Sequence, residues 1–442
     1  MSIGGNVSDS CRVHLINPPS ALGTVANREG GGGMGTVYCG PKGFLYPPHT
    51  LAMVAGSLRD AGYPVRASDL VVEKSLPNLA DADAVGVFVS HATLDNDLAF
   101  LTNLRKRISA MLVAFGPAMR FVGEDVLARA PVDAVLVGEA EAFFVAALRH
   151  FGRIDSPARR LWTADELSEA RCDEDGLARD LDALPFPAWD LLPHERYSLL
   201  TVMGSRGCPD QCVYCPYAAA QGHRFRARSV ASVLAELAWL DEGLHPGRVV
   251  FRDPVFARDP GRVVDLCEGM LERELHLRWE CESRPEHFDT SLLQLMKRAG
   301  CQWVKVGLET TDKVLLQRLK RVDSTEEAAA YVQHVADVVQ TCNQIDLLCR
   351  LFVMAGLPGQ NQASAEDTAR FVKRIRPAAL NVKLFERYPG MDAVPALDED
   401  RAAQVEILHQ VQQEIQSLQP GPSVVTRARR WLRGVLRRGR HG

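Results

Sequence analysis

Short apolar runs alternate with helical patterns along most of the chain, and they do so in two separate series. Strands that alternate with helices of about 10–15 residues are typical of parallel sheets covered by helices. The first series, within residues 1–155, predicts strands over Val13–Asn17, Val65–Leu70, Ala84–Ser90, Ala110–Phe115 and Ala134–Val137, with helices over Leu51–Gly62, Leu94–Ile108 and Ala140–His150. We therefore expect a doubly wound, Rossmann- or flavodoxin-like α/β domain, whose ligand would lie at the carboxyl ends of its strands.

The second series begins at Leu199 and contains six further strand patterns with helical patterns between them. Its strands are expected over Leu200–Met203, Val249–Arg252, Leu277–Glu282, Trp303–Leu308, Asp346–Met354 and Leu380–Phe385. Six β/α units predict a partial TIM barrel over residues 198–395, with its active site at the C-terminal strand ends. Residues 156–197, richer in Asp, Pro and Arg, are assigned to a linker, and residues 396–442 to a closing helix (Arg401–Leu418) and an Arg-rich tail.

Charge and hydropathy narrow the classes of function. The net charge is −4, although the last 23 residues carry seven arginines and no acid, so the rest of the chain is distinctly acidic. An acidic body argues against nucleic acid as the main partner. No stretch reaches the roughly 18–20 apolar residues of a membrane-spanning helix, and the polar N-terminus does not resemble a signal peptide. We expect a cytoplasmic protein without a membrane span.

Three of the eleven cysteines stand out by their spacing. Cys208, Cys212 and Cys215 form C-x-x-x-C-x-x-C in the segment GSRGCPDQCVYCPY, directly after the first strand of the second series. Three thiolates on one loop can hold three irons of a cubane cluster and leave the fourth iron open to a ligand. A structural zinc site would need a fourth ligand, and a second C-x-x-C at a suitable distance is missing. The motif therefore predicts a [4Fe–4S] cluster with one open iron.

This loop resembles the signature of the radical S-adenosylmethionine (SAM) superfamily, including the aromatic Tyr214 before the third cysteine. The resemblance implies that SAM binds the open iron and that one electron from the cluster cleaves it to a 5'-deoxyadenosyl radical. It also implies SAM contacts at successive strand ends, where each residue could instead be an ordinary strand-end charge or turn. These residues are Asp253 in FRDPVF, Arg284 in ECESRPEHF, Glu309 in VGLET and Gly356 in GLPG, and the resemblance implies a further SAM contact at Tyr214 of the cysteine loop.

The first domain resembles the cobalamin-binding domain that precedes the barrel in class B radical SAM methyltransferases. The matching segments are INPP (Ile16–Pro19), YPPHTLAMVAGSLRDAGYPVRASDL (Tyr46–Leu70), DAVGVFVSHAT from Asp83, LVAFGP from Leu112 and VLVGEAE from Val135. The resemblance implies cobalamin contacts from hydroxyl groups and from glycines that admit a close backbone approach. The residues are Pro19, Ser90, Thr93, Gly116, Gly138 and Glu139. A domain that keeps this fold but has lost the cofactor is the alternative.

A glycine run, Gly30–Gly33 followed by Met34 and Gly35, lies early in the first domain. It lacks the Gly-Lys-Ser/Thr ending of a phosphate-binding loop. We expect instead a mobile loop that faces the substrate.

The order of the two domains favours a cobalamin-dependent C-methyltransferase that acts on an unactivated carbon of a small natural-product intermediate. In the subclass that it resembles, one SAM methylates the reduced cobalt and a second SAM supplies the radical that removes a substrate hydrogen atom. The substrate radical then takes the methyl group. Radical rearrangement, cyclisation or sulfur insertion, with a degenerate or non-methylating cobalamin domain, is the alternative, and a sensor that does not cleave SAM is a third hypothesis. The expected partners are a small-molecule substrate and an electron donor such as a flavodoxin or ferredoxin.

Overall fold

The computed structural model describes residues 11–39, 44–151, 160–163, 176–388 and 402–417. The chain divides into two compact units, a first unit of residues 1–282 and 387–393 and a second unit of residues 283–386 and 394–442. The division falls inside strand β13 (Trp279–Ser283), in the middle of the region predicted as the barrel.

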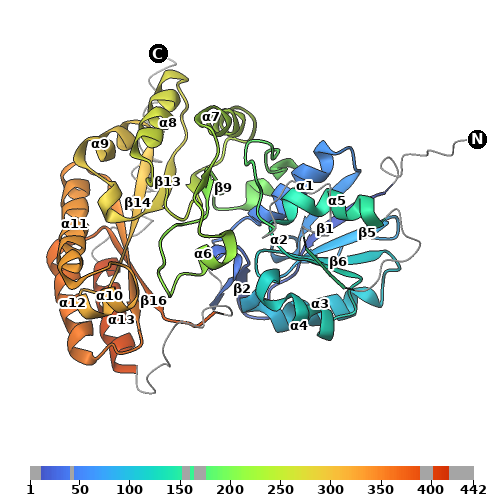
Figure 1. Ribbon diagram of the computed structural model, residues 1–442. Coiled ribbons are helices and arrows are strands. Elements are labelled where there is room, and N and C mark those ends of the chain that lie inside the picture. Colours follow the sequence, from blue (N-terminus) through green and yellow to red (C-terminus); the bar gives the residue numbers. More distant parts are fainter. Residues whose placement is uncertain (1–10, 40–43, 152–159, 164–175, 389–401, 418–442) are drawn as a thin grey trace, which may run out of the picture. The chain divides into compact units, whose positions relative to one another are not determined.

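A six-stranded parallel sheet opens the first unit, in the strand order β4-β1-β5-β6-β7-β8. Its strands are β1 (Val13–Asn17), β4 (Val65–Asp69), β5 (Ala84–Phe88), β6 (Met111–Phe115), β7 (Ala134–Leu136) and β8 (Arg160–Trp162). Its longer helices are α1 (His49–Asp60), α3 (Leu94–Arg105), α4 (Met119–Arg129) and α5 (Ala140–Phe151), and the short helix α2 (Leu70–Glu73) follows β4. Helices α1 and α5 cover one face of the sheet, and α3 and α4 cover the other (Figure 1). The doubly wound fold is thus confirmed.

The order of the first five strands along the chain is that of flavodoxin-like folds, in which the order reverses between the first and third strands. Here this switch point lies between β1 and β5. Because helices cover both faces, every residue of these two strands is buried, as expected for a parallel sheet. Strand β8 lies in the stretch that the sequence assigned to the linker, and it extends the sheet beyond residue 155.

The glycine run is a tight turn between two antiparallel strands, β2 (Thr24–Asn27) and β3 (Thr36–Cys39). Residues Gly31–Gly33 form a 3₁₀ turn, in which the Gly33 N–H donates to Glu29 O (3.2 Å) and the Gly35 N–H to Gly30 O (2.8 Å). The side chain of Met34 is fully buried in the core of the first sheet. In place of the mobile loop that we expected, the structure shows an anchored turn.

The first unit also contains the opening strands of the second series. Strands β9 (Leu200–Val202), β12 (Val249–Phe251) and β13 pair in parallel. Helices α6 (Pro216–Gln221) and α7 (Val230–Trp239) lie between β9 and β12 in the sequence, and α8 (Pro260–Glu272) lies between β12 and β13. Helices α7 and α8 begin at Ser229 and Asp259, whose side chains accept hydrogen bonds from backbone N–H groups of the first turn. Such N-caps satisfy donors that the helix itself leaves free.

The second unit continues the same alternation. Strands β14 (Cys301–Glu309), β15 (Leu348–Ala355) and β16 (Ala379–Leu384) are parallel to their neighbours. Its helices are α9 (Thr290–Arg298), α10 (Lys313–Arg318), α11 (Thr325–Gln344), α12 (Gln362–Ile375) and α13 (Ala402–Ser417). All six strands of the predicted partial barrel are present, which confirms that fold class. The predicted closing helix corresponds to α13, and the Arg-rich tail lies outside the described residues.

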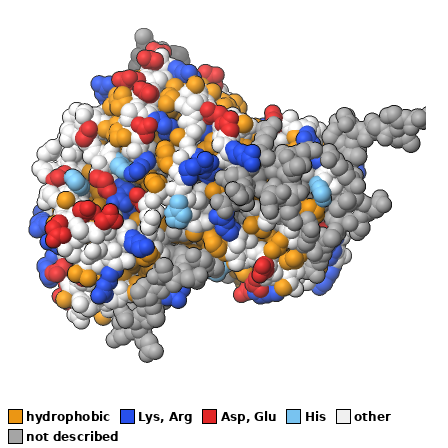
Figure 2. Space-filling view, viewed as in Figure 1, with side chains coloured by type: hydrophobic (Ala, Val, Ile, Leu, Met, Phe, Trp, Pro, Cys, Tyr) orange, Lys and Arg blue, Asp and Glu red, His pale blue; other side chains and the backbone are white. Residues whose placement is uncertain are grey.

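In the part of the chain that the structure describes, no helix combines the length and apolarity needed to cross a bilayer. Basic and acidic side chains are interspersed with hydrophobic ones on the face shown in Figure 2.

Candidate functional site

The three cysteines of the motif lie on one loop between β9 and α6. We call residues Gly204–Tyr217 the cluster loop. Its base is a two-stranded antiparallel ladder of β10 (Ser205–Arg206) and β11 (Arg226–Ala227). The Cys208 N–H donates to Gly222 O (3.1 Å), the Cys215 N–H donates to Cys212 O (3.2 Å), and Cys215 is the residue before α6. The structure therefore brings the three thiols together, with half-buried Tyr214 in the turn between Cys212 and Cys215.

The chemistry of the thiols fits an iron–sulfur cluster. Burial raises the pKa of Cys208 and of Cys215 to about 12, and the Cys212 thiol adds to both shifts, so these thiols stay protonated until a metal displaces the proton. Among the described residues, no group of three His, Cys, Asp or Glu side chains could hold a single metal ion. A zinc ion would require sulfurs that converge to about 2.3 Å from one point, whereas the thiolates of a cubane each bind a different iron. The donor set thus favours the cluster over zinc.

Asp253 anchors the start of the cluster loop. Its carboxylate follows β12 and accepts hydrogen bonds from the Gly204 N–H (2.8 Å) and the Ser205 hydroxyl (2.6 Å). Arg262 donates to the carbonyl of the same Gly204 (2.9 Å). Burial raises the pKa of Asp253, and Arg262 opposes that shift. The carboxylate is therefore engaged within the protein, and a direct SAM contact for Asp253 stays a prediction.

The other three predicted SAM residues belong to the second unit. Arg284 follows β13, donates to Arg321 O (2.9 Å) and lies over the Tyr331 ring, 5.9 Å from its centroid. Glu309 ends β14 at a β-bulge, with φ +63° and 7% exposure. Gly356 follows β15, and its N–H donates to Gln360 Oε1 (2.8 Å). Each residue thus lies at the carboxyl end of a strand, where barrel enzymes place their active-site groups.

The residues predicted to contact cobalamin follow four adjacent strands of the first sheet. We call the segments after β1, β5, β6 and β7 the carboxyl edge. Gly116 follows β6 with φ +142°, and a Cβ atom there would lie 2.5 Å from Val89 O. At Gly138, after β7, a Cβ would lie 2.5 Å from Gly176 O. Only glycine fits these two turns, because a backbone carbonyl of a neighbouring segment fills the space where each side chain would begin.

The hydroxyl groups of Ser90 and Thr93 are engaged within the protein. Their oxygens lie 2.8 Å apart, and the Thr93 hydroxyl donates to Asp97 Oδ2 (2.6 Å). Asp97 in turn forms an ion pair with Arg28, and both side chains are at most 1% exposed. In this structure the two hydroxyl groups are not directed to a ligand. Contacts of these side chains with cobalamin therefore stay a prediction.

The Arg28–Asp97 pair extends into a chain of buried polar groups along the carboxyl edge. Arg28 also donates to Pro18 O (2.9 Å) and to Asn17 Oδ1 (3.0 Å). The neighbouring Pro19 O accepts from Asn96 (2.9 Å). Sequence analysis did not identify Arg28 or Asp97, because they are 69 positions apart and belong to no motif.

Glu139 joins the carboxyl edge to the cluster loop. Its carboxylate pairs with Arg226 (2.8 Å) and Arg206 (3.1 Å), and Arg206 also pairs with Glu141 (2.6 Å). Burial alone would raise the pKa of Glu139, but the two arginines outweigh it and hold that pKa below its ordinary value. Burial alone would lower the pKa of Arg206, but the two glutamates more than offset it and raise that pKa. Because Arg206 stands two residues before Cys208, this buried ionic cluster links the carboxyl edge to the cluster loop.

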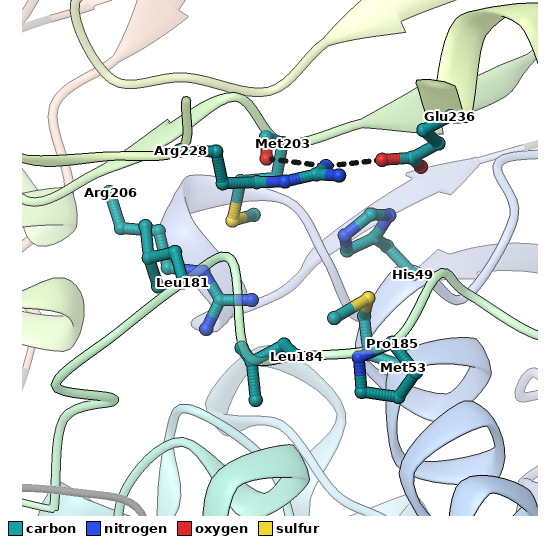
Figure 3. A pocket seen from close by; sticks show the side chains of 9 residues that line it. All are labelled: His49, Met53, Leu181, Leu184, Pro185, Met203, Arg206, Arg228 and Glu236. Carbon is teal, nitrogen blue, oxygen red and sulfur yellow. Dashed lines mark hydrogen bonds and ion pairs between the residues drawn. The ribbon is translucent and has the colours of Figure 1, made fainter. Parts of the chain in front are cut away.

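A small cavity lies beside this ionic cluster (Figure 3). It is lined by His49, Met53, Leu181, Leu184, Pro185, Met203, Arg206, Arg228 and Glu236. Its volume of about 10 Å³ has room for about one water molecule. Burial, reinforced by nearby arginines, lowers the pKa of His49 well below its ordinary value, so its ring is neutral at pH 7. His49 Nε2 and Glu236 Oε1 have no partner among the described residues. The cavity suits a bridging water and is too small for SAM or a substrate.

Comparison with known proteins identifies the second series. The model of the radical SAM superfamily matches residues 202–372. Residues 202–372 therefore form a radical SAM domain. An uncharacterised methyltransferase of Pyrococcus horikoshii is 26% identical over 368 residues, which cover 78% of this chain and 77% of that protein.

Two solved structures share the fold of this radical SAM protein. One is the radical SAM methyltransferase TsrM of Kitasatospora setae, with tryptophan substrate and a SAM analogue bound. Its TM-score is 0.66 at 17% identity, over 91% of this chain and 76% of TsrM. The other is OxsB, a cobalamin-dependent SAM radical enzyme, with a TM-score of 0.63 at 17% identity over 92% of this chain and 56% of OxsB. The protein is a radical SAM enzyme, and this assignment implies a [4Fe–4S] cluster and SAM as cofactors.

Proposed function

We propose that this enzyme is a cobalamin-dependent radical SAM methyltransferase that methylates an unactivated carbon of a small natural-product intermediate. One observation carries the proposal: the buried Glu139–Arg206 ion pair ties the carboxyl edge of the first sheet to the cluster loop. A reaction that uses two cofactors on one carbon needs both binding loops at a fixed separation. The names of the Pyrococcus horikoshii relative and of TsrM, both methyltransferases, support the same reaction.

The residues divide into holding and orienting groups. When bound, the cluster supplies the electron that cleaves SAM, and cobalamin carries the methyl group. Cys208, Cys212 and Cys215 would hold the cluster, and Asp253 would fix the loop that carries them. The SAM residues would be Tyr214, Arg284, Glu309 and Gly356, with Arg284 suited to the carboxylate of SAM by a charge-assisted hydrogen bond. Gly116, Gly138 and Pro19 would form the backbone surface for cobalamin, while Ser90, Thr93 and Glu139 would stiffen it.

In the overall reaction a substrate C–H bond becomes a C–CH₃ bond. One SAM gives up its methyl group and leaves as S-adenosylhomocysteine. A second SAM is cleaved by an electron to methionine and the deoxyadenosyl group, which takes the substrate hydrogen atom and leaves as 5'-deoxyadenosine. The electrons come from an external donor, and we propose a flavodoxin or ferredoxin of the cytoplasm.

The first test measures cofactors before any substrate is known. The protein is produced without oxygen, with iron, sulfide and cobalamin supplied, and bound iron and corrin are quantified. We expect about four irons and one corrin per chain, and 5'-deoxyadenosine from SAM only when a reductant is added. Incubation with methyl-labelled SAM and a panel of small molecules, tryptophan among them, then seeks a labelled product. Iron and SAM cleavage without bound corrin would refute methyl transfer by this route.

A second candidate is a radical rearrangement, cyclisation or sulfur insertion. The closed Ser90–Thr93–Asp97 network favours it, because the hydroxyl partners expected for cobalamin are already occupied. Product mass separates the two candidates, since methylation adds one CH₂ unit, whereas a rearrangement leaves the mass unchanged and sulfur insertion adds sulfur. In the second case 5'-deoxyadenosine would form without S-adenosylhomocysteine.

A further inference from the structure

The turn formed by Gly30–Gly35, here called the glycine turn, packs against two other segments of the first unit. On one side it contacts α6, which begins directly after Cys215. A Cβ atom on Gly32 would lie 3.0 Å from Tyr217 Cα and 3.2 Å from its Cγ. This contact is already at the limit that a side chain tolerates, so even a methyl group would press on α6.

On its other side the glycine turn contacts the carboxyl edge of the first sheet. A Cβ atom on Gly33 would lie 2.5 Å from both Cβ and Cγ of Pro117, in the loop after β6. A Cβ atom on Gly35 would lie 2.5 Å from the hydroxyl oxygen of Ser90, after β5. Cβ contacts under about 3 Å do not occur in packed interiors. The turn therefore fills the space between the cluster loop and the carboxyl edge, with no room for side chains at these positions.

The glycine turn is held in place by the residues that flank it. Arg28 forms the buried ion pair with Asp97. The Glu29 carboxylate accepts from the Thr50 N–H (2.7 Å), and the carbonyl of buried Met34 accepts from the Ala92 N–H (2.9 Å). With both ends anchored, the turn cannot step aside, and an added side chain must displace α6 or the carboxyl edge.

We propose that the glycine turn is a spacer that sets the separation between the cluster loop and the carboxyl edge of the first sheet. Its glycines are positioning residues, which act through Tyr217 and Pro117 rather than on a substrate. The inference rests on the proposed function only for the role of this separation, which would be the distance across which the radical and the methyl group must meet. The spacer itself is a property of the protein without cobalamin.

The test enlarges single glycines and uses a matched control. Gly32→Ala and Gly33→Ala add a methyl group at the two contacts. Gly23→Ala is the control, because Gly23 has φ +77°, close to the +69° of Gly32, but nothing lies within 4 Å of its Cβ position. It carries the same backbone strain without the overlap. The double variant Gly33→Ala/Pro117→Gly removes the overlapping proline atoms and should relieve the overlap, leaving only the backbone strain of an alanine at φ +98°.

Two readouts follow these variants in the cluster-reconstituted full chain. Amide hydrogen exchange is first measured without cobalamin over residues 208–221 and 88–93. Overpacking typically costs about 1–3 kcal/mol, so we expect exchange about 5- to 150-fold faster in both segments of Gly32→Ala and Gly33→Ala. Pulsed electron paramagnetic resonance then measures the distance between the reduced cluster and cob(II)alamin in the loaded protein. We expect a longer or broader distance distribution, with wild-type behaviour in Gly23→Ala and a return toward it in the double variant.

Unchanged exchange in both Gly32→Ala and Gly33→Ala overturns the spacer, as does an equal change in Gly23→Ala, which would point to strain alone. If Gly33→Ala does not fold, Gly32→Ala and recovery of folding in the double variant decide the question. A wild-type protein that binds no corrin would refute the proposed function, and the exchange data would still test the spacer.

Discussion

The cluster loop and the carboxyl edge of the first sheet are built in different ways. The cluster loop presents three thiols from one short stretch of sequence, and their number and spacing favour an iron–sulfur cluster. The carboxyl edge presents glycine backbone, and its polar side chains are turned inward to the Arg28–Asp97 ion pair. One region binds by side-chain chemistry, whereas the other offers a shape that buried charges hold rigid.

This difference predicts which substitutions each region tolerates. A ligand set fails when one donor is removed, because no neighbour can replace a thiolate. A surface of backbone fails only when its support collapses or when atoms are added to it. The predictions below test that contrast.

The largest effect is expected from Cys212→Ala. Loss of one thiolate should leave the loop unable to hold the cluster, with bound iron falling to near zero and SAM cleavage lost. The far-ultraviolet circular dichroism should stay that of the wild type, because the carboxyl edge does not depend on the cluster. Cys267→Ala is the control, since Cys267 is a buried core residue of α8. The Cys267→Ala protein should keep the iron content of the wild type. A Cys212→Ala protein with full iron and SAM cleavage would contradict the assignment.

Removal of the support of the carboxyl edge comes next. Asp97→Ala leaves the Arg28 guanidinium buried without its partner, which typically costs about 3–5 kcal/mol. Urea unfolding should show this loss, and corrin binding should weaken while iron content is kept. Asp95→Ala is the matched control on the same helix, because Asp95 pairs with Arg129 at the surface with 87% of its side chain exposed. Its pair is expected to contribute at most about 1 kcal/mol, and equal losses in the two variants would disprove the contrast.

Glu139→Gln tests the link between the two regions. The arginines hold the Glu139 pKa below its unfolded value. The ionised form therefore stabilises the protein above about pH 4.3, and this contribution is lost as the pH falls through the folded pKa. The variant should lose about 1.5–3 kcal/mol at pH 7, the usual worth of a hydrogen bond to a charged group. Its stability should also depend less on acid pH.

Urea unfolding of the wild type and of Glu139→Gln between pH 7 and roughly pH 3.5 measures this dependence. It arises because the folded and unfolded states bind different numbers of protons. Glu124→Gln is the control, because Glu124 is exposed on α4. If the stability profiles of wild type and Glu139→Gln run parallel over this range, the ionic cluster does not contribute in the stated way.

Sequence predicts some elements of the first domain well and misses others, and the physical reasons differ from element to element. Strand β1 coincides with the predicted Val13–Asn17, because a strand buried on both faces is a continuous apolar run. Helix α4 was not predicted, since its amphipathic pattern is weak and is interrupted by Gly123. A Cβ atom at Gly123 would lie 3.1 Å from Leu161 of β8, so this glycine reflects packing on an edge strand that was also not predicted.

The residues of the candidate site also differ in how well the sequence predicts them. Thiol spacing reveals the cluster loop because the ligands are close in sequence. The partner of Glu139 could not be predicted, because Arg206 reaches it only through tertiary folding, and the same holds for the pairing of Arg28 with Asp97. The Thr93–Asp97 hydrogen bond, by contrast, joins residues only four positions apart. A run of glycines in a sequence likewise predicts a flexible loop. In this fold the glycines are needed because Tyr217 and Pro117 leave no room for side chains at Gly32 and Gly33.

A smaller effect is expected from Glu309→Gln on SAM affinity. A charged acceptor for a ribose hydroxyl is typically worth somewhat over 1 kcal/mol more than a neutral one, so the dissociation constant should rise about five- to tenfold. Equilibrium binding of SAM to the cluster-loaded enzyme measures this. Glu326→Gln, at an exposed glutamate of the same unit, should leave the affinity unchanged. Equal affinities in wild type and Glu309→Gln would remove Glu309 from the SAM site.

The smallest effect is expected from Ser90→Ala, and it examines the carboxyl edge most directly. The Ser90 hydroxyl bonds Thr93, and Thr93 keeps its bond to Asp97 when the serine oxygen is removed. Stability should fall by about 1 kcal/mol, and corrin affinity should stay within about twofold of the wild type, a change of under 0.5 kcal/mol. Gly116→Ala is the contrasting variant, because its Cβ would lie 2.5 Å from Val89 O at a φ of +142°. That variant should disturb the edge and weaken corrin binding far more.

Corrin titration monitored by absorbance compares the two variants with the wild type. A loss of more than about tenfold in Ser90→Ala, over 1.4 kcal/mol, would mean that the hydroxyl leaves Thr93 to bind the corrin. The carboxyl edge would then rearrange around its ligand and recognise it by side-chain chemistry, as the cluster loop does. An affinity near that of the wild type would mean instead that backbone shape alone receives the cofactor, with the buried ion pair as its support.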